Sequence, residues 1–148
     1  MKTTNYEISK KLKEAGFEAQ SSFFWCELGK DLIKIHISQS HSVPESIDKT
    51  KAYDLETLLD ALPDSITREY KSNKDGTIKE FKENLVIEKN KILYRCYDID
   101  TSDEANEYSR EYGYEQNISI YHYYDSLANI AGKMLIKLFE SGLIKFNK

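Results

Sequence analysis

The chain has 148 residues, 40% of them hydrophobic and 31% charged, and a formal net charge of −4. This length suffices for one domain with a hydrophobic core, and the composition is that of an ordinary soluble protein. The acidic balance argues against broad, nonspecific binding of duplex DNA, which needs Lys and Arg at the phosphates. It does not exclude a local basic patch.

Targeting signals and disulfides are not expected. No apolar run approaches the roughly 20 residues of a membrane span. The polar N-terminus, Met1–Lys13, does not have the pattern of a signal peptide. Cys26 and Cys96 are the only cysteines and lie far apart in sequence, so we expect a reduced, cytosolic chain.

The first expected element is a short helix near the N-terminus. Thr4 and Glu7 have the spacing of a capping box, and apolar residues follow at helical intervals. Gly16 is expected to end the helix, and Phe17 to pack back on it.

A β-hairpin is expected next, from Ser21–Leu28 and Asp31–Ser38 with a turn between them. A two-residue turn fixes three pairs: Leu28 with Asp31, Cys26 with Ile33, and Phe24 with Ile35. One face is then apolar and is expected to face the core: Phe24, Cys26, Ile33, Ile35 and Ile37. The other face is amphipathic: Phe23, Trp25, Leu32, Lys34 and His36.

The middle of the chain contains a loop, a short helix and strands. Gln39–Lys51 is polar and predicts a loop. Asp54 is expected to cap a Leu-rich helix that Pro63 stops. Three strands are expected after it: Ile66–Tyr70, one within Ile78–Glu88, and Lys91–Asp98.

The last third predicts a short helix between Thr101 and Gly113, a strand over Asn117–Tyr123, and a long amphipathic helix within Asp125–Phe146. Asp125 or Ser126 is expected to cap the long helix, and Gly142 to end it. Its apolar stripe is formed by Leu127, Ile130, Ala131, Met134, Leu135 and Leu138.

These elements predict an α+β fold: an antiparallel β-sheet with an N-terminal, a short middle and a long C-terminal helix packed mainly on one face. We expect a single globular domain over residues 1–148, with an insertion at about 72–122.

Catalytic and metal-binding patterns are weak. Cys26, His36, Cys96 and His122 could form a zinc site, but no two lie at the close spacing typical of zinc ligands. Asp98–Ser109 lacks the Gly and the final Glu of a calcium loop. No nucleophile elbow or Gly-rich phosphate loop is present. The sequence therefore favours a non-enzymatic protein, with no catalytic residue, metal ligand or cofactor assigned.

Two surfaces are candidates for binding. Phe23 and Trp25 beside Lys34 and His36 could stack bases and hold phosphate; alternatively a helix, such as the N-terminal one, covers them. Late tyrosines form either a partner or dimer surface or a half-buried strand and helix. These are Tyr108, Tyr112, Tyr114, Tyr121, Tyr123 and Tyr124.

Three stretches resemble uncharacterised small proteins of bacteriophages and related bacterial mobile elements, Bacteroidota among the hosts. They are Lys10–Ala19, Lys51–Ile66 and Ser126–Phe146, and the hairpin around Trp25 also fits. The resemblance covers roughly the first 66 residues and the last 22, whereas Lys71–His122 does not fit. It implies a phage or prophage accessory protein in the bacterial cytoplasm and brings no cofactor or catalytic residue with it.

The expected function is therefore a non-enzymatic accessory protein that binds a host protein or sequesters a small ligand, in counter-defence. A single-stranded nucleic-acid or nucleotide binder using the hairpin face is the alternative. A metal-dependent hydrolase or metal-stabilised module is the third. The sequence does not decide between a monomer and a homo-oligomer, and no membrane partner is expected.

Overall fold

The computed structural model describes residues 2–71, 76, 78–89, 91–95, 118–121 and 125–146. The chain forms two compact units. The first contains Met1–Leu62 and His122–Lys148, and the second contains Pro63–Tyr121. The second unit is thus inserted in sequence between the two parts of the first. Whether residues 1–148 behave as one domain stays a prediction.

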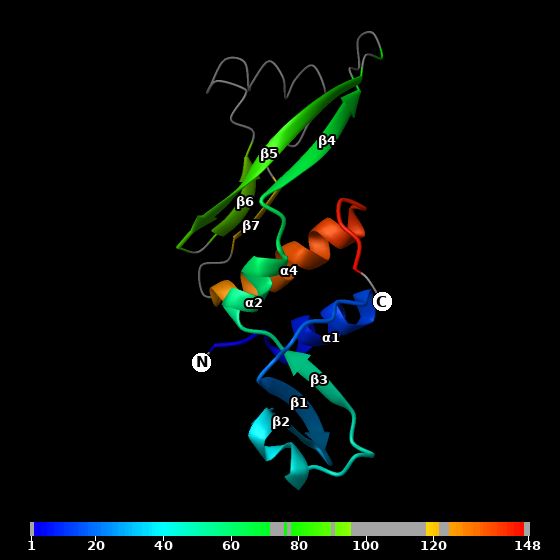
Figure 1. Ribbon diagram of the computed structural model, residues 1–148, viewed down its shortest axis with the longest axis vertical. Coiled ribbons are helices and arrows are strands. Elements are labelled where there is room, and N and C mark those ends of the chain that lie inside the picture. The colour runs from blue at the N-terminus through cyan, green and yellow to red at the C-terminus, as the bar shows by residue number, and fades with distance from the viewer. Residues whose placement is uncertain are drawn as a thin grey trace. The chain divides into compact units, whose positions relative to one another are not determined.

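The α+β class is confirmed, with two antiparallel sheets in place of the one expected (Figure 1). The helices are α1 (Tyr6–Ala15), the 3-10 helix η1 (Ile37–Ser42), α2 (Leu55–Ala61) and α4 (Leu127–Glu140). The first sheet has the order β2-β1-β3, formed by β1 (Phe23–Leu28), β2 (Asp31–His36) and β3 (Lys49–Ala52). The second has the order β4-β5-β6-β7, formed by β4 (Ser65–Lys71), β5 (Ile78–Glu88), β6 (Lys91–Arg95) and β7 (Ile118–Tyr121).

The loop expected over Gln39–Lys51 was wrong at its end, where the chain forms strand β3. This strand pairs antiparallel with β1, with Thr50 opposite Trp25 and Ala52 opposite Phe23. Thr50 and Ala52 are buried. These small or polar side chains alternate with lysines, so the segment has little of the hydrophobicity that marks a strand in sequence.

The core of the first unit lies around α4, whose expected apolar stripe is buried except for half-buried Leu127. Leu135 and Leu138 are completely buried, and α4 contacts both α1 and α2 (Figure 1). Gly132 faces α1: a Cβ built there would lie 2.7 Å from Cγ2 of Ile8. The missing side chain therefore lets the two helices approach closely.

The ends of α4 are as expected from sequence. Ser126 Oγ accepts a hydrogen bond from the backbone N–H of Asn129 at 3.2 Å. Gly142 follows the last turn with a φ of 75°, the left-handed conformation that glycine adopts without strain.

The start of α1 differs from the expected capping box. Asn5, not Thr4, is the N-cap, and its side-chain oxygen accepts from the N–H of Ile8 at 2.9 Å. Thr4 is instead buried and exchanges hydrogen bonds with Tyr53: its N–H donates to Tyr53 O at 2.9 Å, and its Oγ1 accepts from Tyr53 N–H at 3.1 Å.

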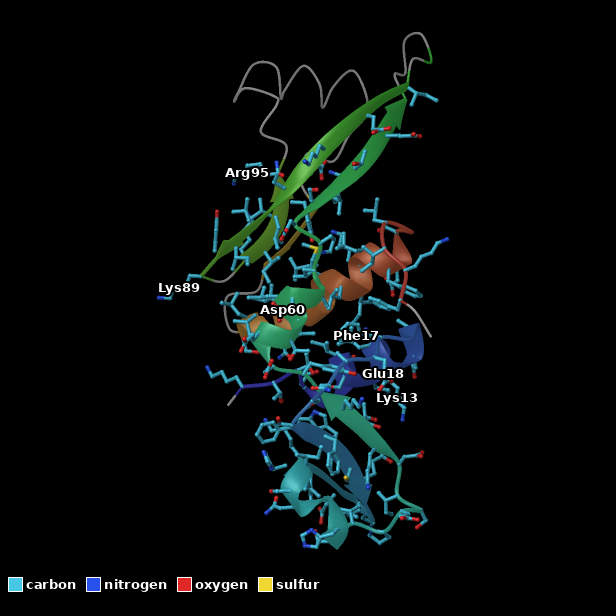
Figure 2. All side chains as sticks on the ribbon, viewed as in Figure 1. Lys13, Phe17, Glu18, Asp60, Lys89 and Arg95 are labelled. Atoms are coloured by element: carbon cyan, nitrogen blue, oxygen red, sulfur yellow. The ribbon has the colours of Figure 1, made fainter. Side chains whose placement is uncertain are left out.

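Phe17 packs back against the core after α1, as expected. Its backbone N–H donates to the carbonyl of Leu12 at 2.9 Å. Its ring, labelled in Figure 2, lies edge-on to the rings of Tyr53 and Phe146, with centroids 4.8 and 5.2 Å away.

The second unit contains a buried ion pair. Glu83 on β5 is completely buried, and both its carboxylate oxygens accept from Nε of Arg68 on β4, at 2.9 and 3.0 Å. Tyr94 is also buried, and its hydroxyl donates to the carbonyl of Pro63 at 2.7 Å. Burial raises the pKa of Tyr94 above its ordinary value.

Several expectations lie outside the described residues. These are the helix between Thr101 and Gly113, the side chains of Cys96 and His122, and Tyr108, Tyr112, Tyr114, Tyr123 and Tyr124. Tyr121 ends β7, but its side chain is also outside the description.

Candidate binding surface on the first sheet

The predicted hairpin register is confirmed for all three pairs: Leu28 with Asp31, Cys26 with Ile33, and Phe24 with Ile35. The same register places Phe23 opposite His36 and Trp25 opposite Lys34. These four residues share one face of the sheet, which we call the aromatic face. The structure therefore brings together all four residues proposed as a ligand site.

Lys34 occupies the centre of the aromatic face. Its Nζ lies 5.5 Å from the ring centroid of Phe23 and 5.8 Å from that of Trp25. It also donates a hydrogen bond to Oγ1 of Thr3 at 3.1 Å. The chain's own cation thus takes the position over the rings that a stacked base or a positively charged ligand would use.

The N-terminal segment covers Trp25. Nε1 of Trp25 donates to the carbonyl of Thr4 at 3.1 Å, and the ring of Tyr6 packs edge-on at a centroid distance of 6.4 Å. The hydroxyl of Tyr6 donates to Glu27 at 2.8 Å. Trp25 is therefore half-buried, and its one polar atom has a partner. The alternative that a helix, such as the N-terminal one, covers the face is met only in part: Thr4 precedes α1, Tyr6 is its first residue, and Lys34 and His36 stay exposed.

Sequence reasoning missed these covering residues individually. Thr3, Thr4 and Tyr6 reach the hairpin across about twenty intervening residues or more. No local spacing marks such a contact. The polar character of Met1–Lys13 gave no signal that its first residues would pack on a sheet.

His36 is placed by Phe23 and Ser38. Its ring lies edge-on to Phe23 at 5.1 Å, and its Nδ1 accepts from the backbone N–H of Ser38 at 3.1 Å. Oγ of Ser38 lies 2.8 Å from the same nitrogen. Because Nδ1 accepts from the Ser38 N–H, the proton of the neutral ring is on Nε2, and the Ser38 hydroxyl is the donor.

This His–Ser contact has the parts of a nucleophile and a base but not the arrangement. Nδ1 of His36 is shared between the hydroxyl and the N–H of the same Ser38. Among the described residues, no carboxylate hydrogen-bonds the ring to orient it as a base. The geometry is that of a local side-chain-to-backbone turn.

The opposite face of the sheet is only partly core. Phe24 and Cys26 are buried against Val43. Burial raises the pKa of the Cys26 thiol, and the nearby charge of Lys49 lowers it less. Ile33 and Ile37, expected in this core, are 41% and 54% exposed.

That expectation was wrong because the segment covering this face reaches only part of it. Val43 and Ile47, which follow η1, pack over Phe24 and Cys26 on the central strand. The outer strand β2 is covered less, so alternation alone did not reveal which of its residues are buried.

Strand β2 is an edge of the sheet, and no described strand pairs with its outer side. Leu32 is 44% exposed on the aromatic face and Ile33 is 41% exposed on the opposite face. The β2 edge, defined as Leu32, Ile33, Lys34 and His36, therefore exposes apolar side chains on both sides of the strand.

The hydrogen bonds between β1 and β2 determine which backbone groups of the β2 edge point away from the sheet. The N–H of Ile37 donates to the carbonyl of Ser22 at 2.7 Å, which continues the β1–β2 ladder. In an antiparallel ladder alternate residues bond the same neighbour, so Ile33 and Ile35 direct their backbone groups toward β1. The N–H and C=O groups of Leu32, Lys34 and His36 therefore point outward.

No metal site is present in the part of the chain that the structure describes: no three His, Cys, Asp or Glu side chains could hold an ion together. Cys26 pairs with Ile33, which lies three residues before His36 on β2. Because side chains alternate along a strand, Cys26 and His36 lie on opposite faces of the sheet. The zinc set that also includes Cys96 and His122 extends outside the described residues.

Among the described residues, two hollows on the first unit are large enough to consider as ligand sites. One, of about 550 Å³, is lined by Lys51, Asp54 and neighbouring serines. Its polar groups are already engaged: Asp54 caps α2 by accepting from Thr57 N–H at 2.8 Å, and Lys51 binds Glu18. The other, of about 470 Å³, lies between α1 and α4, with lysines and glutamates on its rim.

Comparisons with family models, curated proteins and solved structures found no match for this chain. None of the helices in the described residues has the length and apolar character needed to cross a membrane. The surfaces described above are therefore the basis for any functional proposal.

Proposed function

We propose that this protein is a non-enzymatic binding protein that accepts an extended segment of a partner protein along the β2 edge. The observation that carries the proposal is an outer strand with outward backbone groups and two exposed apolar side chains, Leu32 and Ile33. Peptides that add to a sheet edge gain affinity from backbone hydrogen bonds and specificity from alternating side chains.

The two faces of β2 supply different contacts for such a segment. Leu32 lies beside the ring-and-lysine cluster of the aromatic face, whereas Ile33 lies beside half-buried Ile35 on the opposite face. A bound strand with apolar residues at alternating positions would therefore find an apolar neighbour on each side of the sheet.

The setting follows from the resemblance to phage-encoded proteins. It supports a bacterial host protein as the partner, counter-defence as the purpose and the host cytoplasm as the location. Sequestration of a small ligand is less well supported, because several polar groups lining the larger hollow already have partners within the chain.

The test compares capture of proteins from a bacterial lysate, and of extended peptides from a display library, by three forms of the full chain. These are the unchanged protein, Ile33→Glu, and Ile78→Glu as a control with the same charge change at an exposed isoleucine, 62% exposed, in the second unit.

We expect Ile33→Glu to lose at least tenfold in affinity for whichever protein or peptide is captured, and Ile78→Glu to lose none. Equal capture by all three forms would overturn the β2 edge as the site. Capture of nothing by the unchanged protein would overturn the proposal as a whole. Circular dichroism checks that the variants are folded.

A single-stranded nucleic-acid binder is the second candidate, because Phe23, Trp25, Lys34 and His36 do share one face. This function requires Lys34 to leave the rings and contact phosphate. Oligonucleotide titration followed by the fluorescence of Trp25 tests it. A quench that weakens with salt supports the idea, and an unchanged spectrum excludes it.

A further inference from the structure

We propose that a second copy of this chain pairs with the β2 edge, antiparallel and across a two-fold axis. The resulting sheet has the strand order β3-β1-β2-β2-β1-β3. This inference shares the edge with the proposed function but not the partner. Two copies held together in this way form a resting state with which a partner segment must compete.

Symmetry restricts how two β2 strands can pair. A two-fold axis perpendicular to the sheet keeps each face on its own side, so every residue faces a residue of the same face. The outward residues Leu32, Lys34 and His36 must then hydrogen-bond among themselves. Every such axis passes through a residue. An axis at Ile33 or Lys34 pairs five residues of each β2 strand, whereas an axis at any other residue of the strand pairs three or fewer.

Charge selects the axis at Ile33. Centring on Lys34 places the two copies of Lys34 directly opposite each other. This arrangement opposes two cationic side chains, which destabilises a strand pair. Centring on Ile33 places Ile33 against the partner's Ile33, and Leu32 against the partner's Lys34.

This register also fits the exposure of the side chains. Ile33 meets the partner's Ile33 at a non-hydrogen-bonded position, where opposite side chains come closest. Ile33 is the exposed isoleucine of β2 and would become covered by this contact. Leu32, the other exposed apolar residue of the β2 edge, would lie along the methylene stem of the partner's Lys34.

Lys34 does not block the pairing. A lysine on an edge strand commonly prevents a second strand from docking, because its charge would be buried without a partner. Here Nζ of Lys34 is turned back over its own sheet, toward Oγ1 of Thr3 and the rings of Phe23 and Trp25. Its charge therefore has partners that a docking strand would leave in place.

The size of the contact predicts a weak dimer. The register provides about four backbone hydrogen bonds between the strands. A pair of six-residue strands stays in the range below roughly 1,200 Å² of total buried area, which is typical of transient complexes. We therefore expect monomers and dimers to exchange as concentration changes.

Analytical ultracentrifugation of the full chain, from about 1 μM to about 1 mM, measures this equilibrium. We expect the unchanged chain and Ile78→Glu to dimerise within that range, and Ile33→Glu to weaken dimerisation at least tenfold. A monomer throughout the range, or a dimer that Ile33→Glu leaves unchanged, would overturn the inference.

A disulfide test addresses the register. In a chain carrying Cys96→Ser, Ile33→Cys should form a disulfide dimer on mild oxidation, because the two Cα atoms would be close enough for a bridge. Leu32→Cys should not, because it faces the partner's Lys34. Equal crosslinking by both variants would contradict the axis at Ile33.

The two proposals fail separately. If the chain never dimerises but Ile33→Glu abolishes partner capture, only the self-pairing is wrong. If the chain dimerises through Ile33 but captures no protein or peptide, the proposed function is wrong and the self-pairing stands.

Discussion

The backbone N–H of Asn5 donates to the side-chain oxygen of Asn129 at 2.8 Å, which joins the N-cap of α1 to the first turn of α4. Asn129 in turn donates through its amide nitrogen to Oδ1 of Asp125 at 2.6 Å. Nζ of Lys133 donates to the other oxygen, Oδ2, at 2.8 Å. A continuous series of polar contacts therefore links two helices that are distant in sequence.

Asp125 makes the stability of the protein depend on pH. Burial raises the pKa of its carboxyl, but hydrogen bonds from Lys133, Asn129 and the Ser126 N–H outweigh burial and hold the pKa below its ordinary value. The stabilisation from this group is therefore present above about pH 4 and is lost as pH falls through the lower pKa of the folded state.

Asp125→Asn should accordingly lower the free energy of unfolding by about 1–3 kcal/mol at pH 7. The difference from the unchanged protein should shrink as the pH falls below 4. Urea denaturation at several pH values measures it, with the exposed Asp60→Asn as the control. A difference independent of pH would show that the charge of Asp125 is not what stabilises α4.

Gly132 should not tolerate a side chain while Ile8 is present. A Cβ at Gly132 would lie 2.7 Å from Cγ2 of Ile8 and 3.1 Å from Cγ2 of Thr4. Overpacking of this kind costs about 1–3 kcal/mol, against a helix-propensity gain of about 1 kcal/mol for Gly→Ala. We expect Gly132→Ala to lower the melting temperature.

A double mutant separates the two effects. Ile8→Leu removes the branching methyl at Cβ while keeping the volume of the side chain. In that background Gly132→Ala should be neutral or stabilising. If it destabilises both backgrounds equally, contact with Ile8 is not the reason that glycine is needed.

The hydroxyl of Thr4 should stabilise the first unit. It lies 2.6 Å from Oγ of Ser9, which itself donates to the Asn5 carbonyl at 2.7 Å, so the Thr4 hydroxyl is the donor of the pair. It also accepts from the N–H of Tyr53. Thr4→Val preserves shape but leaves that buried N–H without its acceptor, which costs about 1–3 kcal/mol.

Thermal denaturation measures the loss, and Thr4→Ser is the matched control because it keeps the hydroxyl. Thr4→Ser should be the milder change. If Thr4→Val is as stable as the unchanged protein, the buried series of hydrogen bonds contributes nothing to folding.

The ion pair of the second unit should be sensitive to the loss of one partner. Glu83 is completely buried, and the side chain of Arg68 is 15% exposed. Glu83→Gln keeps the shape of the side chain but removes the charge that balances Arg68, so we expect a loss of roughly 3 kcal/mol in the free energy of unfolding. Exposed Glu80→Gln on the same strand is the control, and an equal effect of both changes would contradict the prediction.

Local chemistry explains which parts of the fold were predictable. The two-residue turn at Gly29 and Lys30 fixed the hairpin register, and the regular apolar spacing of α4 fixed its buried side. β3 was missed because its buried positions, Thr50 and Ala52, lack a strong apolar pattern. The register of β1 and β2 also placed the candidate site residues correctly on one face.

The covering of the aromatic face was not predictable residue by residue. It depends on contacts from Thr3, Thr4 and Tyr6, which no spacing in the sequence connects to Trp25 or Lys34. The exposure of Ile33 likewise depends on how far the segment after η1 extends, which is a property of the folded chain.

The insertion of residues 63–121 between the parts of the first unit affects the order of events during synthesis on the ribosome. Ile8, Leu12 and Leu58 are translated long before the α4 residues that cover them. Until α4 emerges from the exit tunnel, these apolar side chains lack the cover that α4 provides. The core that contains the first-translated residues is therefore completed only after the whole insertion has been translated.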